Sequence, residues 1–229
     1  MKLKDKVVII TGASCGLGKA LAGSFQESGC KVIASSNNRV EIKDVARELG
    51  VVPFIADVTK EKDVAKLTAF ALKKFGRIDI WVNNAGITTS NSIPDKMDAK
   101  EAHLIMDVNF FGTAYGMLSA LRVMEKQKSG TIVNVISVRA FEKDVRPGIY
   151  SASKWAVRGF TEGLMKLTPK MKGISIVAVY PGAMKTKLHG KNHPAGYNNF
   201  MEPEFVADKI VRNLGKSKPK TELIIRKGS

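Results

Sequence analysis

The sequence has few cysteines and no long apolar run. Its two cysteines, Cys15 and Cys30, provide neither a disulfide framework nor the spacing of metal ligands. No window approaches the roughly 20 apolar residues of a membrane-spanning helix, and the apolar run Val7–Ile10 is too short for a signal peptide. We therefore expect no membrane association and a reducing, cytoplasmic setting.

Acidic residues are scarce relative to basic ones. There are 21 aspartates and glutamates against 37 lysines and arginines, which gives a formal net charge of +16. Such a balance can indicate a nucleic-acid partner, but the basic residues are scattered and form no arginine-rich or aromatic-interleaved tract. We therefore expect a lysine-rich soluble surface and disfavour nucleic-acid binding. The stretch between Glu162 and Glu202 has no acidic residue and contains these lysines: Lys166, Lys170, Lys172, Lys185, Lys187 and Lys191.

What the chain does contain is a regular alternation of β-branched runs and helical stretches. Its 229 residues suit one large domain spanning 1–229. The pattern predicts strands at 6–11, 31–35, 51–56, 78–82, 131–136, 173–180 and 222–226. Helices are expected at 19–28, 40–49, 60–75, 98–127, from Tyr150 to about Thr168-Pro169, and at 204–214. The alternation predicts an α/β fold, a parallel sheet of about seven strands with helices on both faces.

A glycine-rich turn follows the first predicted strand. Gly12, Gly16 and Gly18 have the spacing Gly-x-x-x-Gly-x-Gly and precede a helix. Glycines allow a tight turn, and the N–H groups of the following helix N-terminus can bind a pyrophosphate. The turn therefore predicts a dinucleotide site, although a glycine-rich turn without a ligand is the simpler alternative.

The second predicted strand lacks the acidic residue expected of an NAD site. That residue normally lies about 20 positions after the glycine turn and binds the ribose 2′-hydroxyl. Here the strand ends in Ser35-Ser36-Asn37-Asn38-Arg39, so no adjacent carboxylate would repel a 2′-phosphate. Ser36, Asn37 and Arg39 could bind that phosphate, which favours NADP(H) while NAD(H) stays possible. Alternatively, Arg39 opens the next helix and points to water.

Polar or small residues follow several other predicted strands. They are Asp57, Asn83 to Gly86, Ser137 and Pro181-Gly182. The carboxyl ends of parallel strands meet at one edge of a sheet, so these residues are expected to gather there. Asp57 could bind an adenine amino group or simply cap the next helix, and Asn83 is expected to brace neighbouring strands.

Tyr150 and Lys154 stand four residues apart on a predicted helix, so they share one face. A nearby cation favours the phenolate, which would let Tyr150 exchange a proton near neutral pH. Ser137 could then hold a substrate oxygen. The simpler alternative is a half-buried tyrosine beside a solvated lysine.

Two other polar features lead to different expectations, a functional role for the first and none for the second. Asn109 lies in the middle of a predicted helix, where asparagine is unfavourable, so we expect it to distort the helix and hold a water. The simpler alternative is an asparagine on a packed helix seam. His189 and His193 have the i, i+4 spacing of a metal pair, but Gly190 and Pro194 flank them and no third ligand is evident. We therefore expect no metal site.

Together these motifs resemble the short-chain dehydrogenase/reductase family over nearly the whole chain, with Thr11 to Gly18, Asn83 to Gly86, Tyr150-x-x-x-Lys154 and Pro181-Gly182-x-x-x-Thr186 in family order. The resemblance implies a Rossmann-type sheet with Tyr150 as the general acid/base. It implies that Ser137 steadies the substrate oxygen, that Lys154 binds the nicotinamide ribose and lowers the pKa of Tyr150, and that Asn109 holds a water of a proton relay. The implied cofactor contacts are Gly12, Ser14, Cys15, Gly16, Leu17, Gly18, Ser36, Asn37, Arg39, Asp57, Val58, Asn84, Ala85, Gly86, Tyr150, Lys154, Pro181, Gly182 and Thr186.

Two positions depart from the pattern of many NADP-preferring relatives. Those proteins carry a basic residue where this chain has Cys15, and an arginine where it has Asn37. Both departures weaken the preference for NADP(H) without supporting NAD(H).

The resemblance also bears on substrate and assembly. The segment 183–202 is rich in Asn, Gly, Pro and Lys and is expected to be a small substrate lid. Its lysines are compatible with an anionic substrate or a carrier-bound acyl thioester, while a small ketone or alcohol fits equally. Relatives often form dimers or tetramers. A catalytically silent NADP(H)-binding sensor is the alternative of a different class, and the complete Asn109, Ser137, Tyr150 and Lys154 set argues against it.

Overall fold

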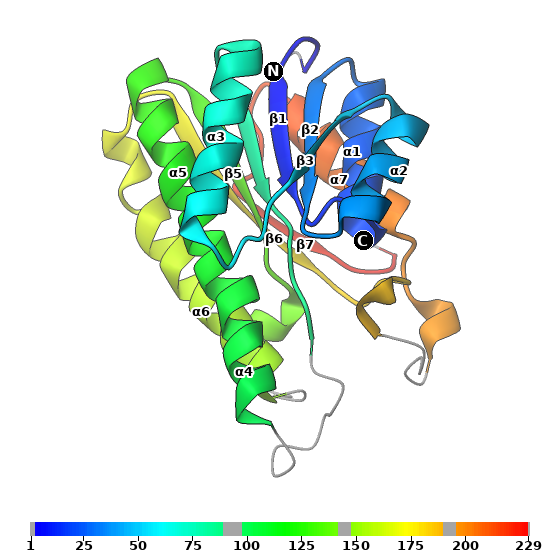
Figure 1. The fold of residues 1–229 in the computed structure, drawn as a ribbon. Coiled ribbons are helices and arrows are strands. Elements are labelled where there is room, and N and C mark those ends of the chain that lie inside the picture. The colour runs from blue at the N-terminus through cyan, green and yellow to red at the C-terminus, as the bar shows by residue number, and fades with distance from the viewer. Residues whose placement is uncertain (1–2, 89–97, 142–147, 190–195, 229) are drawn as a thin grey trace.

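A parallel sheet forms the centre of the molecule (Figure 1). The computed structural model describes residues 3–88, 98–141, 148–189 and 196–228. Within them, seven strands lie in the order β3-β2-β1-β4-β5-β6-β7, and every neighbouring pair is parallel. The strands are β1 Val7–Thr11, β2 Lys31–Ser36, β3 Val52–Ile55, β4 Ile80–Asn83, β5 Gly130–Val135, β6 Ile174–Pro181 and β7 Glu222–Ile225.

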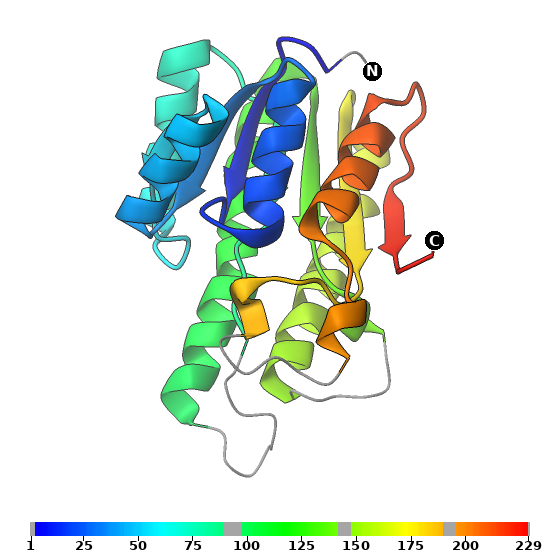
Figure 2. The same ribbon diagram turned by 90° about the vertical axis from the view of Figure 1, so that its right-hand side faces the viewer.

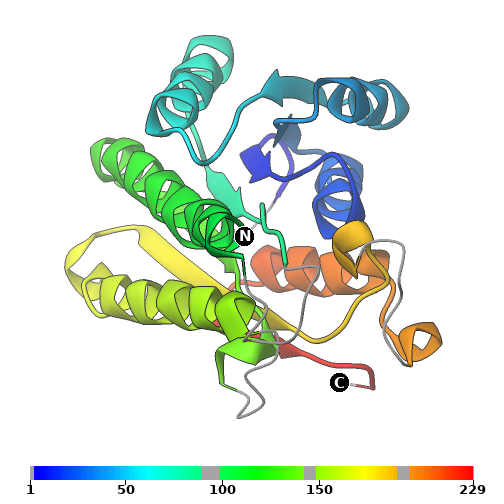
Figure 3. The same ribbon diagram turned by 60° about the horizontal axis from the view of Figure 1, so that its bottom comes forward.

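Helices cover both faces of this sheet. Figure 3 shows α1, α2 and α7 on one side and α3, α5 and α6 on the other. The helices are α1 Gly16–Glu27, α2 Arg39–Leu49, α3 Glu61–Phe75, α4 Ala99–Met106, α5 Gly112–Gln127, α6 Gly148–Met165 and α7 Pro203–Gly215. An apolar cluster fills each interface between sheet and helices. The predicted fold class, a doubly wound α/β sheet, is therefore confirmed.

The apolar composition of the central strands explains why they lie buried in the middle of the sheet. All residues of β1, Val7–Thr11, are buried, as expected for a β-branched run covered on both faces. Next to β1, the Asn83 side chain donates a 2.8 Å hydrogen bond to Asn134 of β5 and accepts one of 2.7 Å from the Trp81 indole. Asn83 thus braces two neighbouring strands, as predicted.

The helix expected at 98–127 is interrupted at its centre. A π-helical turn, Asp107–Phe111, separates α4 from α5, and Asn109 lies in this turn with its side chain fully buried. Such turns insert one extra residue into a helix and often occur at functional sites. The expectation that Asn109 distorts its helix is confirmed.

The continuous segment Ala99–Gln127 is long and apolar enough by composition to cross a membrane. However, 50% of its most apolar window is buried inside the fold. That burial is typical of a core helix in a soluble protein.

One helix is shorter than expected. α6 ends at Met165 rather than near Thr168-Pro169. Proline disfavours the helical conformation in the residue before it, and the chain continues as a 3₁₀ turn over Thr168–Lys170.

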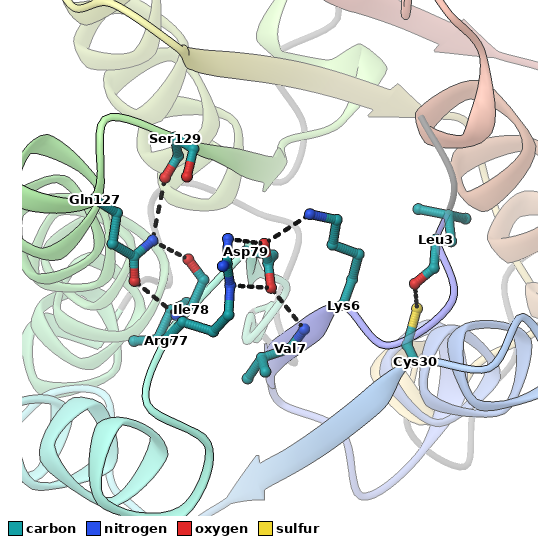
Figure 4. A network of polar contacts seen from close by, with 9 residues as sticks. All are labelled: Leu3, Lys6, Val7, Cys30, Arg77, Ile78, Asp79, Gln127 and Ser129. Atoms are coloured by element: carbon teal, nitrogen blue, oxygen red, sulfur yellow. Dashed lines mark hydrogen bonds and ion pairs between the residues drawn. The ribbon is translucent and has the colours of Figure 1, made fainter.

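A buried carboxylate ties the amino-terminal edge of the sheet together (Figure 4). Asp79 accepts hydrogen bonds from Lys6, from the backbone N–H of Val7 and from two nitrogens of Arg77, all between 2.7 and 3.0 Å. Burial by itself would raise the pKa of Asp79, but these hydrogen bonds outweigh it and lower the pKa. This network lies at the opposite end of the strands from the polar residues that follow them, so its role is structural.

Both cysteines are free thiols. Cys30 is buried near the same edge, where its thiol donates to the Leu3 carbonyl at 3.2 Å (Figure 4). Burial raises the pKa of Cys30 to about 11, which keeps it protonated and unreactive.

Candidate active site

The side chains singled out in the sequence meet at the carboxyl-terminal edge of the sheet. Ser137 follows β5, and Tyr150 and Lys154 lie on the first turns of α6. A hydrogen bond joins the Ser137 side chain to the Tyr150 phenol. The Lys154 Nζ atom lies 5.6 Å from the centre of the Tyr150 ring. The hydroxyl, the phenol and the amine therefore share one site, as the sequence predicts.

The loop that carries Ser137 is fastened to the tyrosine helix. The Ser137 hydroxyl accepts a 3.2 Å hydrogen bond from the backbone N–H of Arg139. Arg158 of α6 donates to the Ala140 carbonyl at 3.2 Å, and its guanidinium lies 5.2 Å from the centre of the Phe141 ring. These contacts hold Ser137 in place relative to α6.

The pKa of Tyr150 is raised rather than lowered. Burial is the dominant cause, and the hydrogen bond from Ser137 and the positive charge of Arg139 oppose it. The resemblance implied instead that Lys154 lowers this pKa. The cation that lowers the pKa of the phenol in this structure is Arg139, and the Lys154 Nζ atom lies 5.6 Å from the ring centre.

Lys154 is a buried amine with few partners. Its Nζ atom donates a 3.3 Å hydrogen bond to the Val135 carbonyl, and burial lowers the pKa of Lys154 to about 8. A Cβ atom on Gly86 would lie 3.5 Å from this Nζ and 3.4 Å from the Asn109 carboxamide oxygen. The absence of a side chain at Gly86 therefore leaves space beside the amine.

Hydrogen bonds to two separate segments hold the Asn109 side chain. Its carboxamide accepts from the Ile87 N–H and donates to the Ile87 carbonyl, each at 2.9 Å. It also donates to the Ser153 hydroxyl at 2.9 Å, and Ser153 in turn donates to the Tyr150 carbonyl at 2.7 Å. The π turn thus aims Asn109 at the tyrosine helix. That Asn109 holds a water stays a prediction.

The glycine turn packs tightly and leaves backbone donors free. Gly16 has φ +52°, which favours glycine, and a Cβ on Gly18 would lie 2.1 Å from the Gly12 carbonyl oxygen. Leu17 is buried in the core, so it can offer only its backbone. Cys15 is the N-cap of α1 but makes no side-chain hydrogen bond to it. The first N–H groups of α1 are therefore uncapped by a side chain.

Asn84 fastens this turn to β4. Its side-chain nitrogen donates to the carbonyls of Thr11 at 3.0 Å and Gly12 at 3.1 Å. The Thr11 hydroxyl accepts from the N–H groups of Asn84 and Ala85 at 3.1 and 3.2 Å. The Asn84 side chain is thus committed to shaping the turn.

A chain of hydrogen bonds links the end of β2 to the glycine turn. The Ser36 hydroxyl donates to the Ser14 hydroxyl and accepts from the Asn38 N–H, each at 3.1 Å. Asn37 is exposed. Arg39 is also exposed and opens α2, as the alternative interpretation expected. Whether Asn37 or Arg39 binds a phosphate stays a prediction.

A carboxylate does reach this region, contrary to the expectation. Glu41, in the first turn of α2, accepts a hydrogen bond from Ser14 and forms a 2.9 Å ion pair with Lys187. The hydrogen bond from Lys187 is the main cause of the lowered pKa of Glu41. Sequence reasoning considered only the residues from Ser35 to Arg39 and missed Glu41, which lies two positions further along.

Asp57 closes a turn after β3. Its Oδ1 atom accepts from the N–H and hydroxyl of Thr59 at 3.1 and 2.8 Å. Burial would raise the pKa of Asp57, but hydrogen bonds from Thr59 and Lys60 lower it. The N-cap of α3 is Lys60, so the interpretation of Asp57 as the helix cap is wrong. An adenine contact by Asp57 stays a prediction.

The neighbouring Val58 packs closely on Gly112. A Cβ atom on that glycine would lie 2.8 Å from the Val58 side chain.

The chain after β6 crosses the glycine turn (Figure 2). Pro181 ends β6, and the Gly182 N–H donates to the Ile225 carbonyl of β7 at 2.9 Å. Beyond it, Thr186 lies so near the turn that a Cβ on Gly16 would be 3.1 Å from its methyl group. Thr186 therefore reaches the predicted pyrophosphate region.

The loop from Ala183 closes on itself through a β-bridge between Met184 and Met201. A cavity of about 510 Å³ separates it from the glycine turn, lined among others by Ser14, Cys15, Thr186 and Tyr197. Residues 190–195, with His193 and Lys191, lie outside the described part of the chain.

The two lysines of this loop that lie in the described part of the chain, Lys185 and Lys187, are not free charges. Lys185 pairs with Glu202 at 2.5 Å, and Lys187 pairs with Glu41 at 2.9 Å. Each ammonium is thus neutralised by a carboxylate that is distant in the sequence or lies across the loop. The lysine content of the loop is therefore a weak argument for an acidic substrate or carrier.

The described residues fit a dinucleotide. The uncapped N–H groups of α1 suit a pyrophosphate. The Lys154 ammonium uses one donor on the Val135 carbonyl and keeps others for sugar hydroxyls, in the space that Gly86 leaves open.

Comparisons with known proteins agree with this geometry. The family model described as short chain dehydrogenase matches residues 6–195. The chain belongs to the short-chain dehydrogenase family. It is 35% identical over 221 residues to an uncharacterized oxidoreductase of Staphylococcus aureus (strain MRSA252), with 94% of each chain covered. As a short-chain dehydrogenase it is an oxidoreductase, and the resemblance inferred from the sequence is confirmed.

Solved structures of the family share the fold. The 3-ketoacyl-(acyl-carrier-protein) reductase from Brucella melitensis, complexed with NADH, is 27% identical with a TM-score of 0.90 and covers 99% of this chain and 98% of its own. The alcohol dehydrogenase from the archaeon Thermococcus sibiricus, complexed with 5-hydroxy-NADP, is 24% identical with a TM-score of 0.87, and the match covers 97% of both chains. These two neighbours are thus complexed with different nicotinamide nucleotides.

Sequence reasoning missed three side chains that shape this site. Ser153 looks like an ordinary helix residue, and only the i+3 spacing from Tyr150 hinted at it. Arg139 stands two positions after Ser137, where its charge reaches the phenol. Glu41 became visible only through its partner Lys187.

Proposed function

We propose that this short-chain dehydrogenase transfers a hydride between a nicotinamide cofactor, preferably NADP(H), and a small carbonyl compound or secondary alcohol. The observation that carries the proposal is the meeting of Ser137, Tyr150 and Lys154 beside the open backbone of Gly86. A phenol, a hydroxyl and an amine in this arrangement suit proton transfer at a substrate oxygen.

Each side chain has a separate task in this reaction. When bound, the nicotinamide supplies or accepts the hydride. Tyr150 gives a proton to the substrate oxygen during reduction and takes it back during oxidation, and the Ser137 hydroxyl donates a hydrogen bond to the same oxygen. Lys154 binds the sugar next to the nicotinamide with its remaining donors. Asn109, fixed by Ser153, completes the polar path by which the phenol recovers its proton.

Substrate access is controlled by a short lid, which we place at about 183–202. Lys185 pairs with Glu202, and Lys187 pairs with Glu41 on α2, so the described lysines of the lid make their ion pairs away from Tyr150. A small neutral carbonyl compound is therefore favoured over a carrier-bound acyl thioester or another anionic substrate.

Exposed apolar side chains support assembly into a homodimer or homotetramer. Phe111, Leu118 and Trp155 are 43%, 39% and 48% exposed, and they lie on the π turn, α5 and α6. Apolar residues on neighbouring helices are candidates for an interface between copies. Light scattering after size exclusion would give the number of copies.

An activity panel tests the proposed function. NADPH and NADH oxidation would be followed with ketones, aldehydes and acyl thioesters, and NADP⁺ reduction with secondary alcohols. We expect turnover with small carbonyl compounds and a preference for NADPH. Binding of NADPH without turnover on any substrate would instead favour the silent sensor, and absence of nucleotide binding would reject both.

A further inference from the structure

An ion pair bridges the lid and α2 across the glycine turn. Lys187 of the lid lies 2.9 Å from Glu41 in the first turn of α2. Ser14 of the turn donates to the same carboxylate, and Ser36 at the end of β2 donates to Ser14 at 3.1 Å. Four side chains from four separate segments thus form one connected polar chain.

The position of this chain gives it chemical meaning. In sheets of this topology, side chains at the end of the second strand contact the adenosine ribose, where a carboxylate binds a 2′-hydroxyl and a cation accommodates a 2′-phosphate. The connected polar side chains include both charges as an ion pair, Glu41 and Lys187, which is linked through Ser14 to Ser36 at that strand end.

The ion pair is able to exchange partners. Lys187 is 71% exposed at its side chain, and an ammonium has three donors, of which one serves Glu41. A phosphate could therefore share Lys187 with Glu41. Lys185 does not compete for this role, because it pairs with Glu202 at the base of α7 instead.

We infer that Lys187 binds the ribose 2′-phosphate of NADP(H), and that Glu41 holds Lys187 at that position, so that this ion pair sets the cofactor preference. The inference rests on the proposed function. Without Lys187, the bare Glu41 carboxylate would repel a 2′-phosphate and could accept a hydrogen bond from a 2′-hydroxyl. Without the charge of Glu41, the ammonium would act on the phosphate unopposed.

The test is a fluorescence titration of NADPH and NADH binding, which needs no substrate. Lys187→Ala should weaken NADPH binding by about tenfold or more, because a charge-assisted hydrogen bond is lost and a carboxylate is exposed. NADH binding should stay within about twofold or tighten. Glu41→Gln should tighten NADPH binding and leave NADH binding unchanged.

Lys66→Ala is the matched control. Lys66 is 72% exposed and ion-paired with Asp63 on α3, so its loss removes the same charge from the other face of the sheet. Both affinities should be unchanged in this variant. Adenosine 2′,5′-bisphosphate and adenosine 5′-monophosphate, used as competitors, isolate the phosphate: Lys187→Ala should weaken only the bisphosphate.

The outcomes separate the two proposals. Equal weakening of NADPH and NADH in Lys187→Ala would place the lysine on the shared pyrophosphate and overturn the inference. Unchanged affinities would overturn it as well. In either case the proposed oxidoreductase function would stand, whereas failure of the wild-type protein to bind either nucleotide would remove both.

Discussion

The Asn109 carboxamide donates a 2.9 Å hydrogen bond to the Ser153 hydroxyl, and this contact joins the π turn to the helix that carries Tyr150 and Lys154. Both side chains are fully buried. The hydrogen bond therefore fixes the direction in which the Asn109 carboxamide faces the site.

Ser153→Ala tests this relationship. Losing one hydrogen bond that orients Asn109 should lower kcat by about tenfold, while the NADPH dissociation constant stays nearly unchanged. Ser151→Ala is the control, because the neighbouring Ser151 hydroxyl is equally buried but has no hydrogen-bond partner among the described residues. Equal activities for the two variants would show that Ser153 does not position Asn109.

The raised pKa of Tyr150 predicts opposite pH profiles for the two directions. Burial favours the neutral phenol, so the free protein holds its proton at neutral pH. Carbonyl reduction needs that proton and should be sustained at neutral pH, then fall under alkaline conditions. Alcohol oxidation needs the phenolate and should rise as the pH increases. Initial rates across pH 6 to about 10 would show this, and parallel profiles would contradict it.

Lys154→Met should stabilise the protein while it removes activity. Burial lowers the pKa of Lys154 from 10.5 to about 8, a shift that corresponds to about 3 kcal/mol against the charged form. Methionine fills a similar volume without a charge, so the melting temperature should rise by about 5 °C.

The pH dependence of that gain is specific. Below the folded pKa, Lys154 is charged in both the folded and unfolded states, and the cost of burying the charge is complete. As the pH rises from about 8 towards 10.5, the folded protein loses the proton first and the cost fades. The advantage of Lys154→Met should therefore shrink over that range in denaturant titrations. A constant advantage would mean that packing, not charge, causes it.

Asp79→Asn should lower the stability of the protein without changing its substrate affinity. Asp79 is buried and bonded to Lys6, Arg77 and the Val7 N–H, so neutralising it should destabilise the protein by about 3 kcal/mol. The free energy of unfolding would be measured with urea. Because Asp79 lies at the amino-terminal edge, the Michaelis constants should not change at a temperature where the variant is folded. A selective loss of substrate affinity would show that this edge communicates with the site.

The sequence predicted those features that follow from short-range patterns. The β-branched runs indicated buried parallel strands, and the polar residues after them gathered at one edge because parallel strands end together. Asn109 indicated the helix distortion, because asparagine is unfavourable in the interior of a helix. Ser137, Tyr150 and Lys154 came together as expected.

The remaining features depend on contacts between distant residues. Glu41 and Lys187 are 146 positions apart, and the residues near each one in the sequence do not predict that the two side chains pair. The pKa of Tyr150 is set by burial and by Arg139, and the extent of burial could not be read from the residue pattern. Ser153 is one serine among several on α6, and only the structure shows that it faces Asn109.

The most direct test of the account is Tyr150→Phe, which removes one hydroxyl from the site. Paired measurements of NADPH binding by fluorescence and of turnover with the best carbonyl substrate are needed. We predict that turnover falls by about a thousandfold or more while the NADPH dissociation constant stays within about threefold. Turnover close to that of the wild-type protein would contradict the assignment of Tyr150 as the proton donor.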